Sequence, residues 1–439
     1  MGATAALAVA LTACSGTSSN PVPSTPGALS GGGMQNSLSM GGPQNGYYAL
    51  SSPTAARQAC PFDASNPHAW RCFAWIRTDL HPIGGGDTSI PTGVGYTPKD
   101  IESAYSLNPA AGAGQRVYII DAYGYKAAAA DLAKYRAAAG LPACTIANKC
   151  LQILNQNGKP SPLPAQPPGS YAGWMVEQSL DVDAVSAACP KCSITLVQTN
   201  TSGTLQNGIV AAVTLGGKIV SMSFGGGESP YSGNPFPAGV VFVASAGDQG
   251  GGLKDGGGPQ QPCTYAAVVC VGGTALTHTA TAWTEKVWDD LAVDLCGSGS
   301  SPCGATGSAC SLVVPKPKWQ TDPLCKKRSA ADVSAVAAVT TPLAIYNSNF
   351  GGWIGVGGTS LSAPLIAGVF GLAGNAATFG EGASKIWASH SSLHDVTVGT
   401  NVLTAVTGPC ASSVKYICVA GPGYDGPTGW GTPKGSTNF

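Results

Sequence analysis

Gly351-Gly-Trp-Ile-Gly-Val-Gly-Gly-Thr-Ser-Leu-Ser-Ala-Pro364 is followed by an apolar run from Leu365 to Ala373. This pattern predicts a glycine-rich loop that leads into a buried helix and delivers Ser360 to the start of that helix. Free backbone N–H groups and the helix dipole favour negative charge at such a position. A nucleophilic serine there suits a reaction whose attack generates an oxyanion. A serine N-cap on a core helix is the alternative interpretation of the same residues.

Strands and helices alternate through the preceding part of the chain. Near-continuous apolar strands that alternate with helices are typical of a parallel sheet covered on both faces. Ligands of such sheets lie outside the carboxyl ends of the strands, where Asp121, Ser223 and Asp248 fall. The sequence therefore predicts an α/β fold of three layers, with a mostly parallel sheet between helices. The strands are expected at 117–122, 193–198, 218–224 and 239–246, and the helices at 127–139, 173–188 and 205–215.

The expected helix at 173–188 carries a pair of acidic residues. Glu177 and Asp181 are four residues apart, so they share one face of the helix. Two carboxylates at this spacing repel each other unless water solvates them or they share a proton in a site. The neighbours are mostly apolar, which argues against a solvated acidic face. Asp183 is expected to point elsewhere and to lie outside the site.

A third acidic residue, Asp248, follows the buried strand expected at 239–246, in the stretch Ser245-Ala-Gly-Asp248. A carboxyl group donates a hydrogen bond only when it is protonated. A protonated Asp248 could therefore support an oxyanion, whereas an aspartate that forms a turn with its own backbone is the alternative.

These segments, in this order, resemble the sedolisin family of serine-carboxyl peptidases, in its bacterial secreted subgroup. Gly-Thr-Ser360-x-x-x-Pro364 is shared by subtilisin-like and sedolisin-like peptidases, and the resemblance runs from Gly95 to the C-terminus. A subtilisin needs a histidine between its aspartate and its serine. Only His278 lies between Asp121 and Ser360, and it lacks the expected His-Gly-Thr context. The resemblance therefore favours the sedolisin group and implies a subtilisin-like fold.

The resemblance implies an acid-active endopeptidase that hydrolyses polypeptide substrates. Glu177 would be the general base for Ser360, Asp181 would orient Glu177, and protonated Asp248 would stabilise the oxyanion. A glutamate with a reference pKa of ~4.3 can accept a proton in acid, where a histidine would be charged. Phe224 stands where the family commonly has tryptophan. The resemblance further implies a supporting acid at Asp121 and substrate-binding residues at Ser221, Ser223 and Gly225.

The C-terminal region resembles the calcium site of the same family. It contains His394-Asp-Val-Thr and Ala420-Gly-Pro-Gly-Tyr-Asp-Gly. Carboxylates and backbone carbonyls are hard oxygen donors, which suit calcium and not zinc. The resemblance implies one structural calcium ion held by Asp395, Val396, Gly421, Gly423 and Asp425.

Composition narrows the range of partners. The 439 residues include 22 basic and 22 acidic side chains, and charged residues make up 10% of the chain. No basic stripe or acidic tail suggests nucleic acid or another polyanion. The chain is expected to act as a monomer on polypeptides.

The cysteines and the N-terminus predict export. Residues 1–14 resemble an export signal, and Leu11-Thr-Ala-Cys14 resembles a lipobox, which would lipidate Cys14 in the cell envelope; an ordinary cleaved secretory signal is the alternative. Fourteen further cysteines fit seven disulfides in an oxidising compartment. Local pairs are expected at Cys60–Cys72, Cys144–Cys150, Cys189–Cys192, Cys263–Cys270 and Cys410–Cys418, while Cys296, Cys303, Cys310 and Cys325 permit three connectivities.

The chain is expected to divide into a signal, an N-terminal extension and a peptidase domain. Residues 15–92 are predicted to form a flexible tether and a short disulfide-closed extension, and residues 93–439 the peptidase domain. The stretch before residue 93 is too short and too polar for the long folded propeptide that the family usually carries. An inactive relative that binds without cleaving and a tripeptidyl exopeptidase of the same family are the alternative functions.

Overall fold

A computed structural model describes residues 56–63, 65–80, 89–251, 258–290, 304–402 and 412–439. Its central element is an eight-stranded sheet with the strand order β13-β12-β9-β7-β4-β6-β5, in which β16 also pairs with β12. All pairs in this sheet are parallel except β12–β13. The strands are β4 (Arg116–Ala122), β5 (Leu151–Asn155), β6 (Ser193–Thr199), β7 (Ile219–Met222), β9 (Val241–Ser245), β12 (Val268–His278), β13 (Trp283–Val287) and β16 (Val333–Val336).

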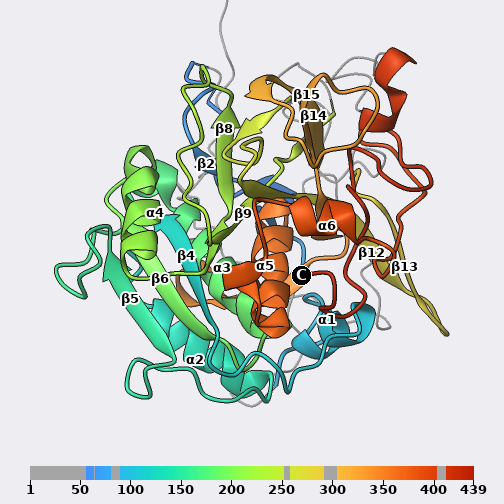
Figure 1. Cartoon of the computed structure of the whole chain (residues 1–439). Helices are drawn as coiled ribbons and strands as arrows, with labels where there is room; N and C mark the ends of the chain where they lie inside the picture. The colour runs from blue at the N-terminus through green and yellow to red at the C-terminus, as the bar shows by residue number, and fades with distance from the viewer. Residues whose placement is uncertain (1–55, 64, 81–88, 252–257, 291–303, 403–411) are drawn as a thin grey trace, which may run out of the picture. The chain divides into compact units, whose positions relative to one another are not determined.

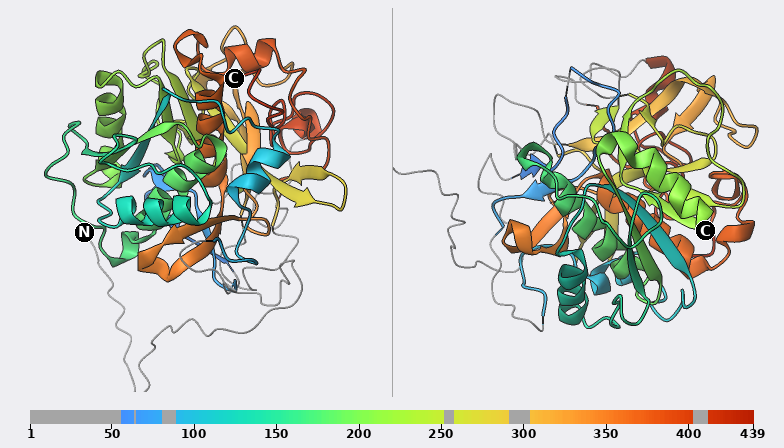
Figure 2. Two further views of the ribbon diagram at one scale, coloured as in Figure 1. Left: turned by 90° about the horizontal axis from the view of Figure 1, so that it is seen from below. Right: turned by 90° about the vertical axis from the view of Figure 1, so that its left-hand side faces the viewer.

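Helices cover both faces of this sheet (Figure 1). The backbone of Gly208 in α4 lies against Ile120, whereas Gly371 in α5 lies close to Val117. Alternate residues of a strand point to opposite faces, so α4 and α5 lie on opposite sides of β4. The right-hand view of Figure 2 shows α4 in front of the sheet. The helices are α1 (Pro98–Ala104), α2 (Ala128–Ala138), α3 (Gly173–Ala188), α4 (Leu205–Thr214), α5 (Thr359–Ala373) and α6 (Ser384–Ala388).

The predicted α/β class and three-layer arrangement are confirmed. Expected helix 173–188 matches α3, and the other predicted elements differ from the observed ones by a few residues at their ends. The strand expected at 218–224 is an exception, because it divides after Met222 into β7 and β8 (Phe224–Gly227). β8 leaves the central sheet and pairs with other segments.

Helices α3 and α5 form the buried centre of the molecule. Every residue of α3 is buried, and so are all residues of α5 from Thr359 to Leu372. Small residues let the two helices approach closely, since a β-carbon on Gly368 would lie 2.7 Å from Ala188 Cβ. This packing brings the acidic face of α3 to the N-terminal end of α5.

Three smaller sheets surround the central one. They have the strand orders β1-β3-β18-β17, β10-β14-β15 and β11-β8-β2. In two of them, short strands from residues 56–77 pair with later strands. β3 pairs with β18, which precedes α5, and β2 pairs with β8. The remaining strands are β1 (Ala56–Gln58), β2 (Arg71–Cys72), β3 (Trp75–Arg77), β10 (Gln249–Gly251), β11 (Gln260–Gln261), β14 (Ala305–Pro315), β15 (Lys327–Ala330), β17 (Leu343–Asn347) and β18 (Gly352–Gly357).

Five disulfides lie within the described residues. Four of the predicted pairs are confirmed, namely Cys60–Cys72, Cys144–Cys150, Cys189–Cys192 and Cys263–Cys270. Cys310 pairs with Cys325. Cys14, Cys296, Cys303 and Cys410 lie outside the described residues, as do the predicted signal and most of the predicted tether. None of the described helices is long and apolar enough to cross a membrane.

Candidate active site

Ser360 lies in the first turn of α5, at the position that the glycine-rich stretch predicts. Gly358 precedes the helix with φ of 100°, a conformation that favours glycine. The Ser360 side chain is fully buried, and its hydroxyl donates a hydrogen bond of 2.9 Å to the Ser223 carbonyl oxygen. The amide of Phe73 donates to Ser360 Oγ at 2.9 Å. Ser360 is therefore enclosed by Ser223, which lies between β7 and β8, and by the backbone at Phe73.

Three carboxyl groups gather on the other side of Ser360. Glu177 and Asp181 come from α3 and Asp121 from the end of β4, and each is 0% exposed. Burial raises the pKa of Glu177 well above its usual value, the Asp181 and Asp121 carboxylates raise it further, and the Ser360 side chain acts in the opposite direction. Burial and Asp121 likewise raise the pKa of Asp181, which accepts a 2.7 Å hydrogen bond from Ser223 Oγ. The cluster therefore retains protons well above the ordinary carboxyl range.

Glu177 lies near the Ser360 side chain but is not within hydrogen-bond geometry of it. Among the described residues, neither of its carboxyl oxygens has a partner, and the same holds for both oxygens of Asp121. Burying such oxygens without partners is costly, and it favours their protonated, uncharged form. The ordinary glutamate pKa used in the sequence argument therefore does not describe Glu177 in this closed arrangement.

Asp248 approaches the start of α5 from the end of β9. Its Oδ1 accepts hydrogen bonds from the Thr359 amide at 2.9 Å and from Thr359 Oγ1 at 2.7 Å. Burial raises the pKa of Asp248 to about 7, although the Thr359 bonds, Arg71 and Trp75 act to lower it. Asp248 is thus neutral in acid, with one oxygen fixed by Thr359. Its other oxygen, Oδ2, has no hydrogen-bond partner among the described residues.

The three residues expected to bind substrate have different surroundings. Ser223 bonds Asp181 and Ser360, so its side chain and carbonyl oxygen support the site from within. Gly225 lies in β8 and pairs with Arg71. Ser221 lies in β7 opposite Ile119, and its hydroxyl is buried without a partner in the described part of the chain. Asp183, excluded by the sequence argument, accepts a hydrogen bond from the Tyr346 amide.

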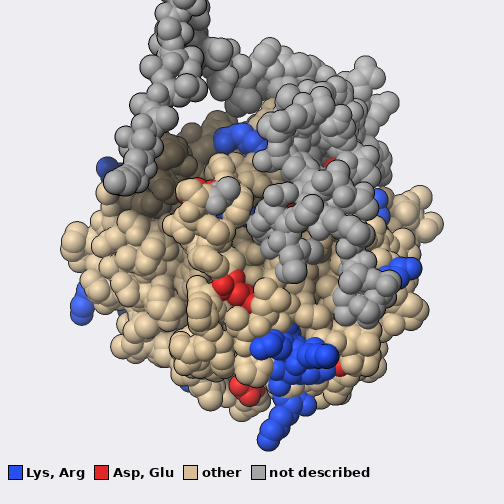
Figure 3. All heavy atoms as spheres, turned by 90° about the horizontal axis from the view of Figure 1, so that it is seen from above, with Lys and Arg blue, Asp and Glu red and all other residues tan. Residues whose placement is uncertain are grey.

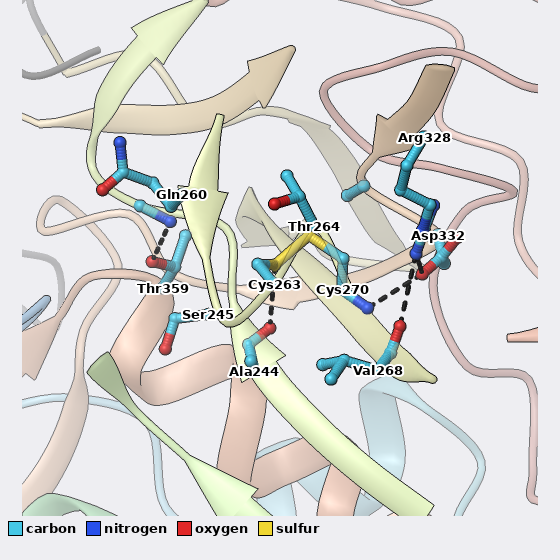
Figure 4. Close-up of a disulfide and its surroundings, with 12 residues drawn as sticks. Ala244, Ser245, Gln260, Cys263, Thr264, Val268, Cys270, Arg328, Asp332 and Thr359 are labelled. Atoms are coloured by element: carbon cyan, nitrogen blue, oxygen red, sulfur yellow. Dashed lines mark hydrogen bonds and ion pairs between the residues drawn. A yellow bond between two sulfur atoms is a disulfide. The ribbon is translucent and has the colours of Figure 1, made fainter. Parts of the chain in front are cut away.

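A disulfide and a buried ion pair brace β9, the strand that precedes Asp248 (Figure 4). Cys263 Sγ lies 3.3 Å from the Ala244 carbonyl oxygen in β9, and Cys263 is bonded to Cys270 in β12. The Cys270 amide donates to Asp332 at 2.8 Å, and Asp332 forms a buried ion pair with Arg328. Such a pair is costly to break because one charge would be left uncompensated. These contacts fix the end of β9 next to α5.

The expected calcium ligands are brought together near the C-terminus. Asp395 Oδ2 accepts from the Gly423 amide at 2.8 Å, and Asp425 Oδ2 accepts from the Gly421 amide at 3.1 Å. Burial raises the pKa of Asp425 to about 7, Thr428 and Gly421 lower it, and Asp395 raises it. Within the described residues, the carbonyl oxygens of Val396, Gly421 and Gly423 accept no backbone hydrogen bond. Two neighbouring carboxylates and free carbonyl oxygens fit a calcium ion.

Sequence reasoning missed the residues that cover Ser360. Phe73 contacts Ser360 through two backbone hydrogen bonds, and Phe73, Ala74 and Trp75 are all at most 3% exposed. The sequence predicts this stretch only as part of a separate extension closed by Cys60 and Cys72. The structure instead joins it to β8 and β18. Where described residues are visible from above, most of the surface is uncharged, and a group of Lys and Arg side chains lies near the lower edge of the view (Figure 3).

Comparison with known proteins identifies relatives of this chain. The sequence model of the subtilase family matches residues 170–401, just over half of the chain. Kumamolisin from Bacillus sp. (strain MN-32) is 29% identical over 77% of this chain and 62% of its own length. Sedolisin from Pseudomonas sp. (strain 101) is 27% identical over 78% of this chain and 60% of its own length. The chain thus spans about 60% of the length of these curated relatives.

A solved structure gives the same fold. It is that of Pseudomonas sedolisin, a serine-carboxyl proteinase, complexed with two molecules of pseudo-iodotyrostatin, and it superimposes with a TM-score of 0.60 at 23% identity. The match covers 78% of this chain and 96% of that one. The chain belongs to the subtilase family and, within it, to the sedolisin group.

Proposed function

We propose that this protein is an acid-active serine-carboxyl endopeptidase. The observation that carries the proposal is the meeting of Ser360, the Glu177–Asp181 face of α3 and the Thr359-bound carboxyl of Asp248 in one buried site. Kumamolisin and sedolisin, both similar to this chain over more than three quarters of its length, support the same reaction class.

The roles follow from the positions of the groups. Ser360 Oγ attacks the carbonyl carbon of the peptide, and its proton passes to ionised Glu177. The Ser360 amide and protonated Asp248 donate hydrogen bonds to the oxyanion. Glu177 then transfers the proton to the leaving amine, and water hydrolyses the acyl-enzyme by the same steps in reverse order. Asp181, which accepts a hydrogen bond from Ser223 Oγ, positions Glu177. Asp121 supports the cluster by carrying part of its negative charge.

The same groups set the working pH. Asp248 donates a hydrogen bond only while it is protonated, and its pKa of about 7 keeps it protonated in acid. Activity should therefore fall as the pH rises towards and above neutrality. The carboxyls of this cluster interact, so the pH profile reports apparent pKa values of the whole set.

A structural calcium ion belongs to the proposal. Asp395 and Asp425, with the carbonyls of Val396, Gly421 and Gly423, would hold it. Bound there, the ion would neutralise two neighbouring carboxylates and tie the segment at 395–396 to the loop at 421–425. It takes no part in the chemistry at Ser360.

An exported location is likewise proposed. Five disulfides within the described residues support an oxidising compartment. The lipid anchor at Cys14 remains a prediction from the sequence. Labelling of the expressed protein with a radioactive fatty acid, with a Cys14→Ser control, would test it.

The test of the function is hydrolysis of an unfolded protein between pH 3 and 8 in calcium, by the chain itself and by a Phe73→Gly chain in which the side chain of the residue that covers Ser360 is removed. Ser360→Ala and Glu177→Gln should each abolish cleavage. Ser362→Ala is the matched control, because Ser362 is a buried serine of the same helix turn that bonds the Thr359 carbonyl. It should leave cleavage unchanged. Cleavage that survives Ser360→Ala, or that is greatest above pH 7, would contradict the mechanism.

A further inference from the structure

After a turn at 67–69, residues 71–77 cross the catalytic serine with β2 and β3 on either side of Phe73. Before Phe73, β2 pairs antiparallel with β8, with Arg71 opposite Gly225. After Phe73, β3 pairs antiparallel with β18, with Trp75 opposite Gly357. Bound peptides commonly add a strand to exposed edges in this way. The segment thus fills the path that a polypeptide substrate would take past Ser360.

The backbone of Phe73 makes contacts expected of a residue under attack. Its carbonyl oxygen accepts a hydrogen bond of 3.3 Å from the Ser360 amide. A β-carbon on Gly358 would collide with that same oxygen and would lie 2.8 Å from Asp248 Oδ2. The Phe73 carbonyl oxygen therefore lies beside both groups that would stabilise an oxyanion.

The side chain of Phe73 identifies a pocket. Phe73 is 1% exposed, and a β-carbon on Gly225 would lie 2.9 Å from Cε2 of its ring. Glycine at position 225 leaves the space that the ring fills. The guanidinium of Arg71 packs over the same ring, 5.0 Å from its centre. The pocket next to Ser360 is therefore shaped for an aromatic side chain.

The segment covers the serine hydroxyl. Ser360 Oγ accepts a hydrogen bond from the Phe73 amide and donates one to the Ser223 carbonyl oxygen. Attack on a substrate requires this hydroxyl to pass its proton to Glu177 instead. With Phe73 in place, the position that a substrate backbone would take beside Ser360 is occupied.

Contacts on both sides of the Phe73–Ala74 bond hold the segment. The Cys60–Cys72 disulfide closes the side before it, and Trp70 stacks on Phe224 with ring centres 5.3 Å apart. After the bond, the Ala59 amide donates to the Ala74 carbonyl at 2.9 Å. β1 also pairs with β3, so residues 56–59 bridge the two sides of the bond. These contacts favour retention of the segment over its release.

We propose that residues 67–77 are a built-in, substrate-like segment that blocks the cleft, with Phe73 in the position of the residue that precedes the cleaved bond. The inference rests on the proposed function and extends it to a substrate class. Once the segment is displaced, the site takes extended polypeptides with an aromatic side chain before the cleaved bond.

The test measures access to the cleft without catalysis. Glu177→Gln provides an inert background that keeps Ser360 and its bonds to Phe73. The probe is a fluorescein-labelled peptide with the sequence of residues 69–76 and the C72S change, and its binding at pH 4.5 in calcium is followed by anisotropy. The E177Q chain should bind the peptide weakly. Adding Phe73→Gly should tighten the apparent dissociation constant at least tenfold, because the pocket and path become available.

Two further variants separate release from misfolding. Phe62→Gly is the matched control, since it truncates a phenylalanine of the same extension that lies outside residues 67–77 and contacts the segment only through the Arg71 guanidinium. It should bind the probe as weakly as E177Q alone. Trp70→Ala loosens the segment at Phe224 and leaves Phe73 unchanged, so it should also tighten binding. Near-UV circular dichroism of each variant should match that of E177Q.

The outcomes distinguish this inference from the proposed function. Equal binding by E177Q and E177Q/F73G would overturn the blocking role, and so would absence of binding to every variant. Peptide binding that appears only with F73G and W70A supports the role, whatever the chain hydrolyses. If those variants with Glu177 restored show no Ser360-dependent cleavage, the proposed function fails while the blocking role stands.

Discussion

Replacing Asp248 by asparagine tests how the site keeps a neutral carboxyl. Asparagine has the shape of the protonated acid, with an oxygen that can accept from Thr359 and a nitrogen that can donate from the other position. The asparagine amide does not titrate between pH 4 and 8. Asp248→Asn should therefore behave like wild type in acid and differ from it near neutral pH.

The magnitude follows from the pKa of Asp248, which burial raises from 3.8 to about 7. Between these values the folded chain binds more protons than the unfolded chain, so stability falls as the pH rises. The contribution of Asp248 is fully present below about pH 4 and is lost as the pH passes 7. At about 1.4 kcal/mol per pKa unit, the loss is about 4 kcal/mol.

The assay is urea unfolding at pH 4, 5.5, 7 and 8 in calcium, in the E177Q background to prevent self-digestion. E177Q and E177Q/D248N should have similar free energies of unfolding at pH 4. At pH 8 the D248N chain should be more stable by about 4 kcal/mol. Free energies that decline in parallel, with a difference below about 1 kcal/mol throughout, would refute the assignment of Asp248 as a buried neutral acid.

Two further predictions concern the oxyanion site and the calcium site. Gly358→Ala should lower kcat/KM at least a hundredfold in the unblocked F73G chain. The added methyl group would occupy the space next to Asp248 Oδ2 where the oxyanion develops. Steady-state kinetics at pH 4 would measure this loss, and a loss below threefold would contradict the prediction. Removal of calcium with a chelator should lower the thermal midpoint, since an ion at one hundred times its dissociation constant contributes about 2.7 kcal/mol. Asp395→Asn, a change at an exposed residue, should abolish the response, and an unchanged chelator effect in that variant would place the ion elsewhere.

Local sequence patterns were sufficient to predict the central helices and strands. The run from Gly173 to Ala188 contains no internal proline or glycine and forms one helix with those bounds. Gly358 and the apolar run after Ser360 likewise specify a loop followed by a buried helix. The carboxyl ends of parallel strands meet at one edge of a sheet, which is why Asp121 and Asp248 could be placed near Ser360.

The covering segment could not be predicted in the same way. Its partners are far away in the sequence, as the pairing of Arg71 with Gly225 shows. Two short strands of two and three residues carry no periodicity that would identify them. The disulfide between Cys60 and Cys72 was predictable, but it says nothing of the surface that the loop contacts. The raised pKa of Glu177 could not be predicted either, because it depends on how deeply the folded chain buries this carboxyl group.

Burial of Glu177 links the blocking segment to the protonation state of the general base. A general base must be ionised before attack, yet burial and the carboxylates of Asp181, Asp121 and Asp248 all raise the pKa of Glu177 in the closed arrangement. Displacing Phe73 would expose Ser360 and the carboxyl groups beside it to water. Better solvation favours the ionised carboxylate. Release of the segment would therefore do more than open a path for substrate, because it would also bring the base into the protonation state that attack requires.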